Sequence, residues 1–237
     1  MDNALTYREV GYCRVIEFGA AACEPVALAE LCDRIAWDEE ARVVLLAFGE
    51  LDDRFQTVPE TAREFLVEPV AKLKQPVIAA MRGDAVGIGL ELALACDLRI
   101  GTENARFGLP QIRENRIPSN GGTQRLPRLV GQGKAIQMIL TGELIDAAEA
   151  CRIGLVNRIV KPESLMSAAM ELAEEMAGKS PLACSYAKEA LYRGGDLSLD
   201  QGLTTELDLY LLLFSTSDRT EGITAFKEKR KPDFKGN

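Results

Sequence analysis

Short apolar runs alternate with helical patterns along the first half of the chain. Runs rich in β-branched residues predict strands, and these runs are Val10–Phe18, Arg42–Phe48, Pro76–Met81, Asp97–Gly101 and Leu155–Val160. Strands separated by helical segments are typical of βαβ units with a parallel sheet. The pattern therefore predicts an α/β fold.

Three helices are expected between these strands. Pro25–Trp37 begins with proline in the first turn and places Leu28, Cys32 and Ile35 on one face, as an amphipathic helix requires. Thr57–Lys74 has a weaker helical period. Gly87–Ala95 indicates a buried helix that is entered through a glycine-rich turn.

The C-terminal part, from about Gly142 onward, is nearly all helical in pattern. Apolar residues recur at helical spacing between Leu165 and Met176, and leucines recur every four residues from Leu199 to Leu211. The second stripe ends in the sequence YLLLF, which is apolar on more than one side. Such a helix lies either in the core or against another subunit.

The amino-acid composition excludes several classes of active site and partner. The 237 residues include no histidine, which excludes the Ser-His-Asp and Cys-His nucleophile systems and zinc held by histidine. The formal net charge of −8 argues against a broad nucleic-acid surface. No apolar stretch approaches the roughly 20 residues of a membrane-spanning helix. We therefore expect neither nucleic acid nor membrane as a partner.

The six cysteines show no C-x-x-C spacing and mostly lie in apolar stretches. This pattern is typical of reduced core thiols, so we expect no metal site. The N-terminal residues lack a basic segment followed by an apolar run, which is the mark of a secretory signal. These features predict a cytoplasmic protein.

The segment PVIAAMRGDAVGIGLELALACD is the strongest candidate for chemistry. A strand leads through Gly83, Gly87 and Gly89 into a helix, and such a turn presents backbone N–H groups that can hold an oxyanion. A dinucleotide fingerprint would need glycine at Leu92, and glycines can also serve close packing alone. Glu91 favours a functional site, because a carboxylate among leucines is costly to bury without a partner or a task.

Several ordered motifs resemble the crotonase (enoyl-CoA hydratase/isomerase) superfamily over residues 42–234. The matching stretches are KQPVIAAMRGDAVGIGLELALACDLRI, ARFGLPQIRENRIPSNGGTQRLPRLVG, AIQMILTGELIDAAEACRIGLVNRIV, SYAKEAL and TSDRTEGITAFKEKRKPDF. The resemblance implies a crotonase-type ββα spiral over residues 1–178 and a helical oligomerisation region over 179–237, which builds a homotrimer or a hexamer.

The resemblance also implies a substrate and a site. The substrate is an acyl-CoA thioester, whose coenzyme A is part of the substrate, so no separate cofactor is expected. The reaction passes through an enolate held in an oxyanion hole. Ile88 matches one backbone donor of that hole, between Gly87 and Gly89 in the substrate-binding turn. Glu91 matches one of the two catalytic glutamates of the hydratases.

Gln111 stands where the family places the second glutamate, in the motif F-G-x-P-E. An amide can hold a water molecule but cannot take its proton. Glu91 alone can still shift a double bond, so the sequence favours an isomerase or a modified hydratase. The alternatives are a C–C hydrolase or decarboxylase, and a catalytically silent subunit with this fold.

Two further segments bear on the ligand. The family loop F-x-A-G-x-D is absent after the Arg42–Phe48 strand, so the first oxyanion donor is unassigned, and an acid at 50–53 is one candidate to enter the site. The C-terminal sequence FKEKRKPDFK is basic in an acidic protein. It is either a solvated tail or, as the resemblance implies, a site for CoA phosphates, with the candidate residues Lys227, Lys229 and Arg230.

Overall fold

A mixed sheet of six strands forms the centre of the computed structural model, which describes residues 5–19, 25–49 and 60–237. The strand order is β1-β2-β3-β4-β6-β9, and all neighbours are parallel except the β1–β2 pair. The strands are β1 Leu5–Val10, β2 Cys13–Phe18, β3 Val43–Phe48, β4 Val77–Met81, β6 Leu98–Thr102 and β9 Arg158–Val160. A smaller sheet joins β5 Ala85–Val86, β7 Arg106–Gly108 and β8 Ile145–Asp146 in the order β5-β7-β8.

The central strand β3 is buried along its whole length. Alternate residues of a strand point to opposite faces, so Val44 and Leu46 join the core cluster on one side while Val43 and Leu45 join the cluster on the other. Burial on both faces is typical of parallel strands covered by helices. The resulting body has three layers.

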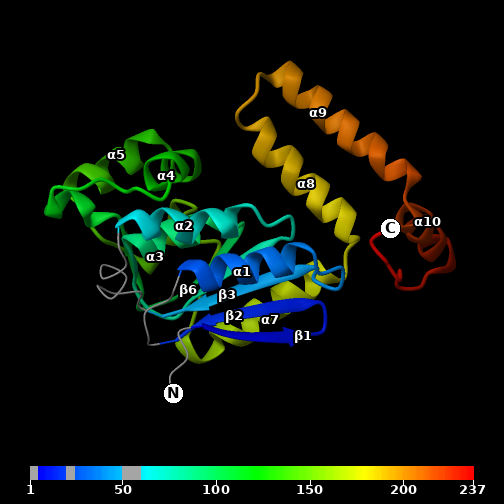
Figure 1. Cartoon of the computed structure of the whole chain (residues 1–237), viewed down its shortest axis with the longest axis horizontal. Helices are drawn as coiled ribbons and strands as arrows, with labels where there is room; N and C mark the ends of the chain where they lie inside the picture. Colours follow the sequence, from blue (N-terminus) through cyan, green and yellow to red (C-terminus); the bar gives the residue numbers. More distant parts are fainter. Residues whose placement is uncertain (1–4, 20–24, 50–59) are drawn as a thin grey trace.

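Helices cover both faces of this sheet (Figure 1). α1 Pro25–Ala36, α2 Glu60–Ala71 and α3 Ile88–Ala95 lie on one face, and α7 Leu165–Ala177 lies on the other. The remaining helices of the body are α4 Gly122–Val130, α5 Gln132–Thr141 and α6 Ala147–Arg152, with short 3-10 turns η2 Pro110–Glu114 and η3 Pro162–Ser164. The predicted α/β class is confirmed.

Three boundaries differ from the sequence prediction. The expected strand Val10–Phe18 is half of a hairpin, because Gly11 takes a positive φ of 56° and reverses the chain after β1. The expected strand Leu155–Val160 begins only at Arg158, since Leu155 and Val156 are buried in the turn before it. The mostly helical part that the sequence predicts from about Gly142 onward is preceded by α4 and α5, and it still contains β8 and β9.

The C-terminal helices α8 Pro181–Gly194, α9 Leu199–Leu212 and α10 Ser217–Glu228 extend away from the body (Figure 1). η4 Leu213–Ser215 links the last two helices. α8 is anchored where β4 and β6 begin: Lys188 Nζ lies 2.8 Å from Asp97 Oδ2, and Tyr192 donates to Asp97 Oδ1 at 2.9 Å. Asp97 also accepts the Val77 N–H at 2.7 Å, so it joins α8 to the start of β4.

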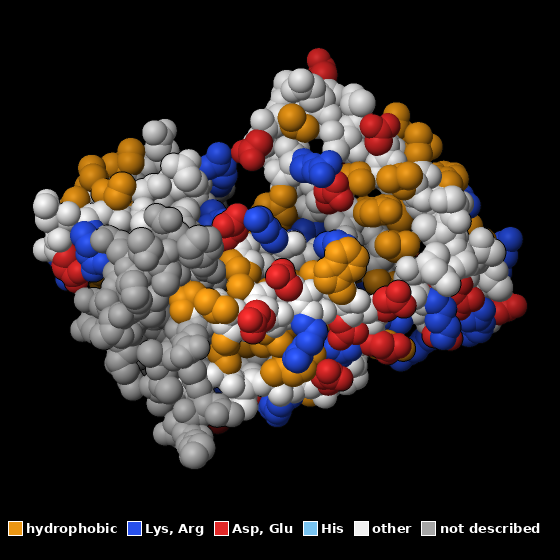
Figure 2. All heavy atoms as spheres, in the orientation of Figure 1, with side chains coloured by type: hydrophobic (Ala, Val, Ile, Leu, Met, Phe, Trp, Pro, Cys, Tyr) orange, Lys and Arg blue, Asp and Glu red, His pale blue; other side chains and the backbone are white. Residues whose placement is uncertain are grey.

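The leucine stripe of α9 is exposed in the single chain. Leu203, Leu207 and Leu211 are each more than half exposed, and Leu209 is the buried residue of this helix. Apolar side chains gather over this part of the surface (Figure 2). The leucine stripe of α9 therefore does not lie in the core of its own chain, which is one of the two alternatives predicted from the sequence.

None of the helices in the described ranges is both long and apolar enough to cross a lipid bilayer. Among the cysteines, Cys13, Cys32 and Cys96 are buried as expected, whereas Cys151 is exposed on α6 and Cys184 is half-buried on α8. Cys23 lies outside the described residues.

Candidate active site

α3 is fixed at both of its ends. At the N-terminus, Gly87 takes φ 60° and ψ −122°, a conformation that favours glycine, and its N–H donates to Gly108 O at 2.9 Å. At the C-terminus, the buried Arg99 guanidinium donates to the carbonyl oxygens of Cys96 at 2.6 Å and of Ala93 at 3.4 Å. These contacts fix the helix that carries Glu91.

The first turn of α3 supplies the predicted backbone donors. The first hydrogen bond within the helix runs from Glu91 N–H to Gly87 O at 3.0 Å. The N–H groups ahead of it, those of Ile88, Gly89 and Leu90, have no partner within the helix, as at any helix N-terminus. They and the helix dipole favour a negative charge here. The turn can therefore stabilise an oxyanion.

Glu91 is 2% exposed, and three donors reach its carboxylate. Oε1 accepts the backbone N–H of Asn120 at 2.7 Å and that of Gly122 at 3.0 Å. Oε2 accepts the side-chain amide of Gln111 at the longer distance of 3.3 Å. Because Oε1 is occupied by two backbone donors, Oε2 is the oxygen that is available to exchange a proton.

Burial raises the pKa of the Glu91 carboxyl above its usual value. The N–H groups of Gly122 and Asn120 and the charge of Arg125 lower the pKa, but desolvation is the larger effect. A carboxyl with a raised pKa accepts and returns protons more readily near neutral pH, as general acid–base catalysis requires. Glu91 therefore has the environment of a catalytic base.

Gln111 lies on η2, directly after Pro110, and its Nε2 points to Glu91. A carboxylate only accepts hydrogen bonds, so the amide must present Nε2 to it and direct Oε1 elsewhere. Gln111 Oε1 is buried and has no hydrogen-bond partner in the described structure. Glu114, three residues further on, instead pairs with Arg116 at the surface.

The loop before α4 and the first residue of that helix supply groups that the sequence did not indicate. Gly122 must be glycine, because a Cβ atom there would lie 3.0 Å from Glu91 Oε1 and 2.8 Å from Pro118 Cβ. Arg125 holds the loop by donating to Asn120 O at 2.8 Å. Backbone donors leave no residue-type signature, and the glycine pair in SNGGTQR is the only signal that could have located them.

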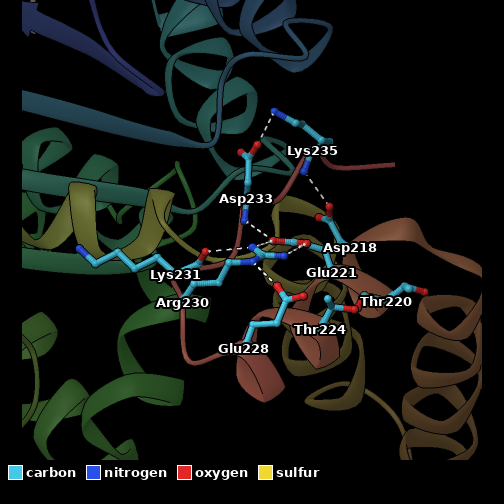
Figure 3. Close-up of polar contacts among 9 residues, drawn as sticks. All are labelled: Asp218, Thr220, Glu221, Thr224, Glu228, Arg230, Lys231, Asp233 and Lys235. Atoms are coloured by element: carbon cyan, nitrogen blue, oxygen red, sulfur yellow. Dashed lines mark hydrogen bonds and ion pairs between the residues drawn. The ribbon is translucent and has the colours of Figure 1, made fainter.

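The basic C-terminal residues are not brought to Glu91 within one chain. α10 lies at one end of the molecule, well away from α3 within the body (Figure 1), and Lys227 and Lys229 lie at the end of α10. Arg230 is held in an ion-pair network (Figure 3): its Nη1 and Nη2 donate to Glu221 at 2.6 and 2.9 Å, and its Nε donates to Glu228 at 2.7 Å.

Glu221 belongs firmly to this network. Its hydrogen bond with Arg230 and the Asp233 N–H lower its pKa to about 2, so its carboxylate stays charged at any ordinary pH. In this chain, Arg230 therefore holds the tail in place rather than presenting free donors to a phosphate. The acids at 50–53 and the region of the unassigned oxyanion donor lie outside the described residues.

A family model described as enoyl-CoA hydratase/isomerase matches residues 25–237. A probable enoyl-CoA hydratase of Rhizobium meliloti is 49% identical over 168 residues, which cover 71% of this chain and 65% of that protein. The (E)-benzylidenesuccinyl-CoA hydratase of Thauera aromatica is 41% identical over 223 residues, which cover 88% of this chain and 87% of that protein. The match to the Rhizobium meliloti protein thus spans less than two thirds of the length of that relative.

Solved structures show the same fold over the whole chain. The crystal structure of an enoyl-CoA hydratase from Bacillus anthracis superposes with a TM-score of 0.92 at 36% identity, and the alignment covers 99% of this chain and 100% of that one. The crotonase fold that the sequence motifs imply is therefore confirmed.

Proposed function

The chain belongs to the enoyl-CoA hydratase/isomerase family, and on this premise we propose that it transfers a proton on an acyl-CoA thioester. Glu91 is the base, and the first turn of α3 stabilises the enolate through the Ile88 N–H. The observation that carries the proposal is the buried Glu91 carboxylate, with Oε1 held by two backbone donors and Oε2 available.

Isomerisation is the reaction that one carboxylate can perform without a second acid–base group. Glu91 Oε2 takes a proton from C2 of a 3-enoyl thioester, and the carbonyl oxygen carries the charge of the resulting dienolate. Glu91 then returns the proton to C4, which leaves the double bond between C2 and C3. Coenzyme A enters only as part of the substrate, and an oxyanion donor typically contributes about 3–4 kcal/mol to such a step.

Hydration of a 2-enoyl thioester is the second candidate, and the Gln111 carboxamide favours it. Its unpartnered Oε1 can hold a water molecule beside Glu91. As the water oxygen bonds to C3, its proton passes to Glu91 Oε2, and Glu91 then gives a proton to C2 of the enolate. The relatives described above are named as hydratases, which supports this candidate.

A direct assay separates these reactions. We expect the purified protein to bind a short-chain acyl-CoA in calorimetry and to convert 3-hexenoyl-CoA into its conjugated isomer, followed by absorbance. Incubation with crotonyl-CoA in D2O reports hydration as 3-hydroxybutyryl-CoA deuterated at C2. Absence of thioester binding would contradict the proposal and favour a catalytically silent subunit.

The substitution Gln111→Glu should raise the hydration rate by about 10²-fold or more, because it supplies a second acid–base group. It should also move the acid limb of the pH–rate profile upward, since a neighbouring carboxylate raises the pKa of Glu91. The matched control is Glu114→Gln on the same 3-10 turn, where the carboxylate is exposed and pairs with Arg116. An unchanged hydration rate in Gln111→Glu would show that the lack of a carboxylate at position 111 does not limit hydration.

We also propose that α9 packs against other copies of this chain in a homo-oligomer. Its exposed leucines Leu203, Leu207 and Leu211 form the kind of continuous apolar surface that marks a subunit contact. In such an assembly Lys227 and Lys229 of one chain can approach the site of another, where their charges suit CoA phosphates.

The double substitution Leu207→Glu/Leu211→Glu should convert the assembly to single chains, because two buried charges in an apolar interface cost more than the contact gains. Light scattering after size exclusion measures the mass. Thr204→Glu, exposed on the same helix but outside the leucine stripe, should leave the mass unchanged. A wild-type protein that already has the mass of one chain would contradict the oligomer.

A further inference from the structure

Asn120 carries a buried polar atom that nothing in the described structure satisfies. Its side chain is 8% exposed, and Oδ1 has no hydrogen-bond partner. The amide nitrogen Nδ2 donates to Ser119 Oγ at 3.3 Å, so half of the carboxamide is engaged and the other half is not. A buried acceptor without a donor costs about 1–3 kcal/mol, so a ligand group that donates to Asn120 Oδ1 would be favoured by this amount.

The position of Asn120 ties this atom to the reacting centre. Its own N–H donates to Glu91 Oε1 at 2.7 Å, and its carbonyl oxygen is fixed by Arg125 at 2.8 Å. The residue is thus held firmly in the wall that carries the base. Gln111 donates to Oε2 of the same carboxylate, and its own Oε1 likewise has no hydrogen-bond donor in the described structure. Two acceptor oxygens that lack donors therefore belong to residues that hydrogen-bond Glu91.

The chemistry of the missing group follows from these acceptors. An amide oxygen accepts a hydrogen bond and has no proton to give, so the ligand must bring an O–H or N–H group. The hydrocarbon part of a simple acyl chain has neither. A hydroxyl on C3 has the required proton, and it lies next to C2, the carbon at which Glu91 acts in the proposed function.

We propose that Asn120 Oδ1 accepts a hydrogen bond from the C3 hydroxyl of a 3-hydroxyacyl thioester, and that Asn120 is a specificity residue for this substrate class. The inference rests on the proposed function and favours its hydration candidate. A site with a buried acceptor discriminates against an analogue that lacks the matching hydroxyl, because the acceptor then stays unpaired.

Calorimetry with two probes tests the proposal. The wild-type protein should bind 3-hydroxybutyryl-CoA about tenfold more tightly than butyryl-CoA, which is the effect of one net hydrogen bond. Asn120→Leu keeps the approximate volume of the side chain but removes the acceptor, and Asn120→Ala removes both. In either variant the two thioesters should bind with similar affinity, mainly through weaker binding of the hydroxyl compound.

Controls separate the possible outcomes. Gln124→Ala removes an exposed amide from α4 and should keep the wild-type preference, and a thermal melt checks that each variant is folded. If a water molecule supplies the donor instead, the wild-type protein will bind both thioesters equally, and this result overturns the inference alone. If neither thioester binds, the proposed function fails and the inference with it.

Discussion

The substitution Glu91→Gln is expected to lower kcat by about 10²–10⁴-fold on any enoyl-CoA that the protein turns over, the usual contribution of a general base. The change is nearly isosteric, so Oε1 of the new amide can still accept the N–H groups of Asn120 and Gly122. The structure should therefore persist while proton transfer is lost. Steady-state kinetics, with thioester affinity measured separately, distinguishes this result from a loss of binding.

The same substitution should raise the melting temperature at neutral pH. Because burial raises the pKa of Glu91 in the folded state, its contribution to stability is present below its ordinary pKa and is lost as the pH rises through the raised value. Glutamine carries no charge to bury. The melting temperature of the variant should therefore exceed that of the wild type at pH values above the raised pKa, and this difference should disappear in acid. Its Nε2 can donate to Gln111 Oε1 once that amide rotates.

Two results would contradict this assignment of the base. Full activity in Glu91→Gln would show that another group takes the proton. A melting temperature that falls equally at all pH values would show that the carboxylate is needed for folding rather than held at a cost for function. A wild-type pH–rate profile should fall toward acid as the Glu91 carboxylate becomes protonated.

Gly122→Ala is expected to displace the Glu91 carboxylate directly. The new Cβ would lie 2.8 Å from Pro118 Cβ, 2.9 Å from Leu109 Cδ1 and 3.0 Å from Glu91 Oε1, all too close for ordinary contact. Overpacking of this kind costs about 1–3 kcal/mol. Displacement of the base by a fraction of an ångström should lower kcat by up to about 10²-fold.

The control for Gly122→Ala is Gly133→Ala in α5, where a Cβ atom meets nothing within 4 Å. It should increase the free energy of unfolding by about 0.4–1 kcal/mol and leave kcat unchanged. Denaturant unfolding and steady-state kinetics measure both variants. Equal kcat values for Gly122→Ala and the wild type would show that the Gly122 contact does not position Glu91.

The sequence predicted the strands and helices whose apolar residues follow one clear pattern. β3 and β4 are continuous apolar runs, and α1 and α7 have one apolar face, so their residues indicate both the element and its burial. β1 was missed because the sequence LTYREV, on the edge of the sheet, alternates too weakly to separate from the strand that follows Gly11.

The candidate site was predictable only in part. Glu91 was found because a carboxylate inside an apolar helix is costly, and Gln111 because its motif places it beside that carboxylate. The backbone donors to Glu91 come from Asn120 and Gly122, about 30 residues further along the chain. Backbone N–H groups belong to every residue type except proline, so only the folded chain shows which of them converge.

Under the proposed function, the clamping of α3 also determines how the site can adapt to new substrates. With Gly87 bound to Gly108 at one end and Arg99 bound to Ala93 and Cys96 at the other, the base cannot follow an acyl chain of different length or branching. If Glu91 is the base, as we propose, evolution of substrate range must act on the surrounding walls, while the carboxylate remains a stationary reference point against which each acyl group is aligned.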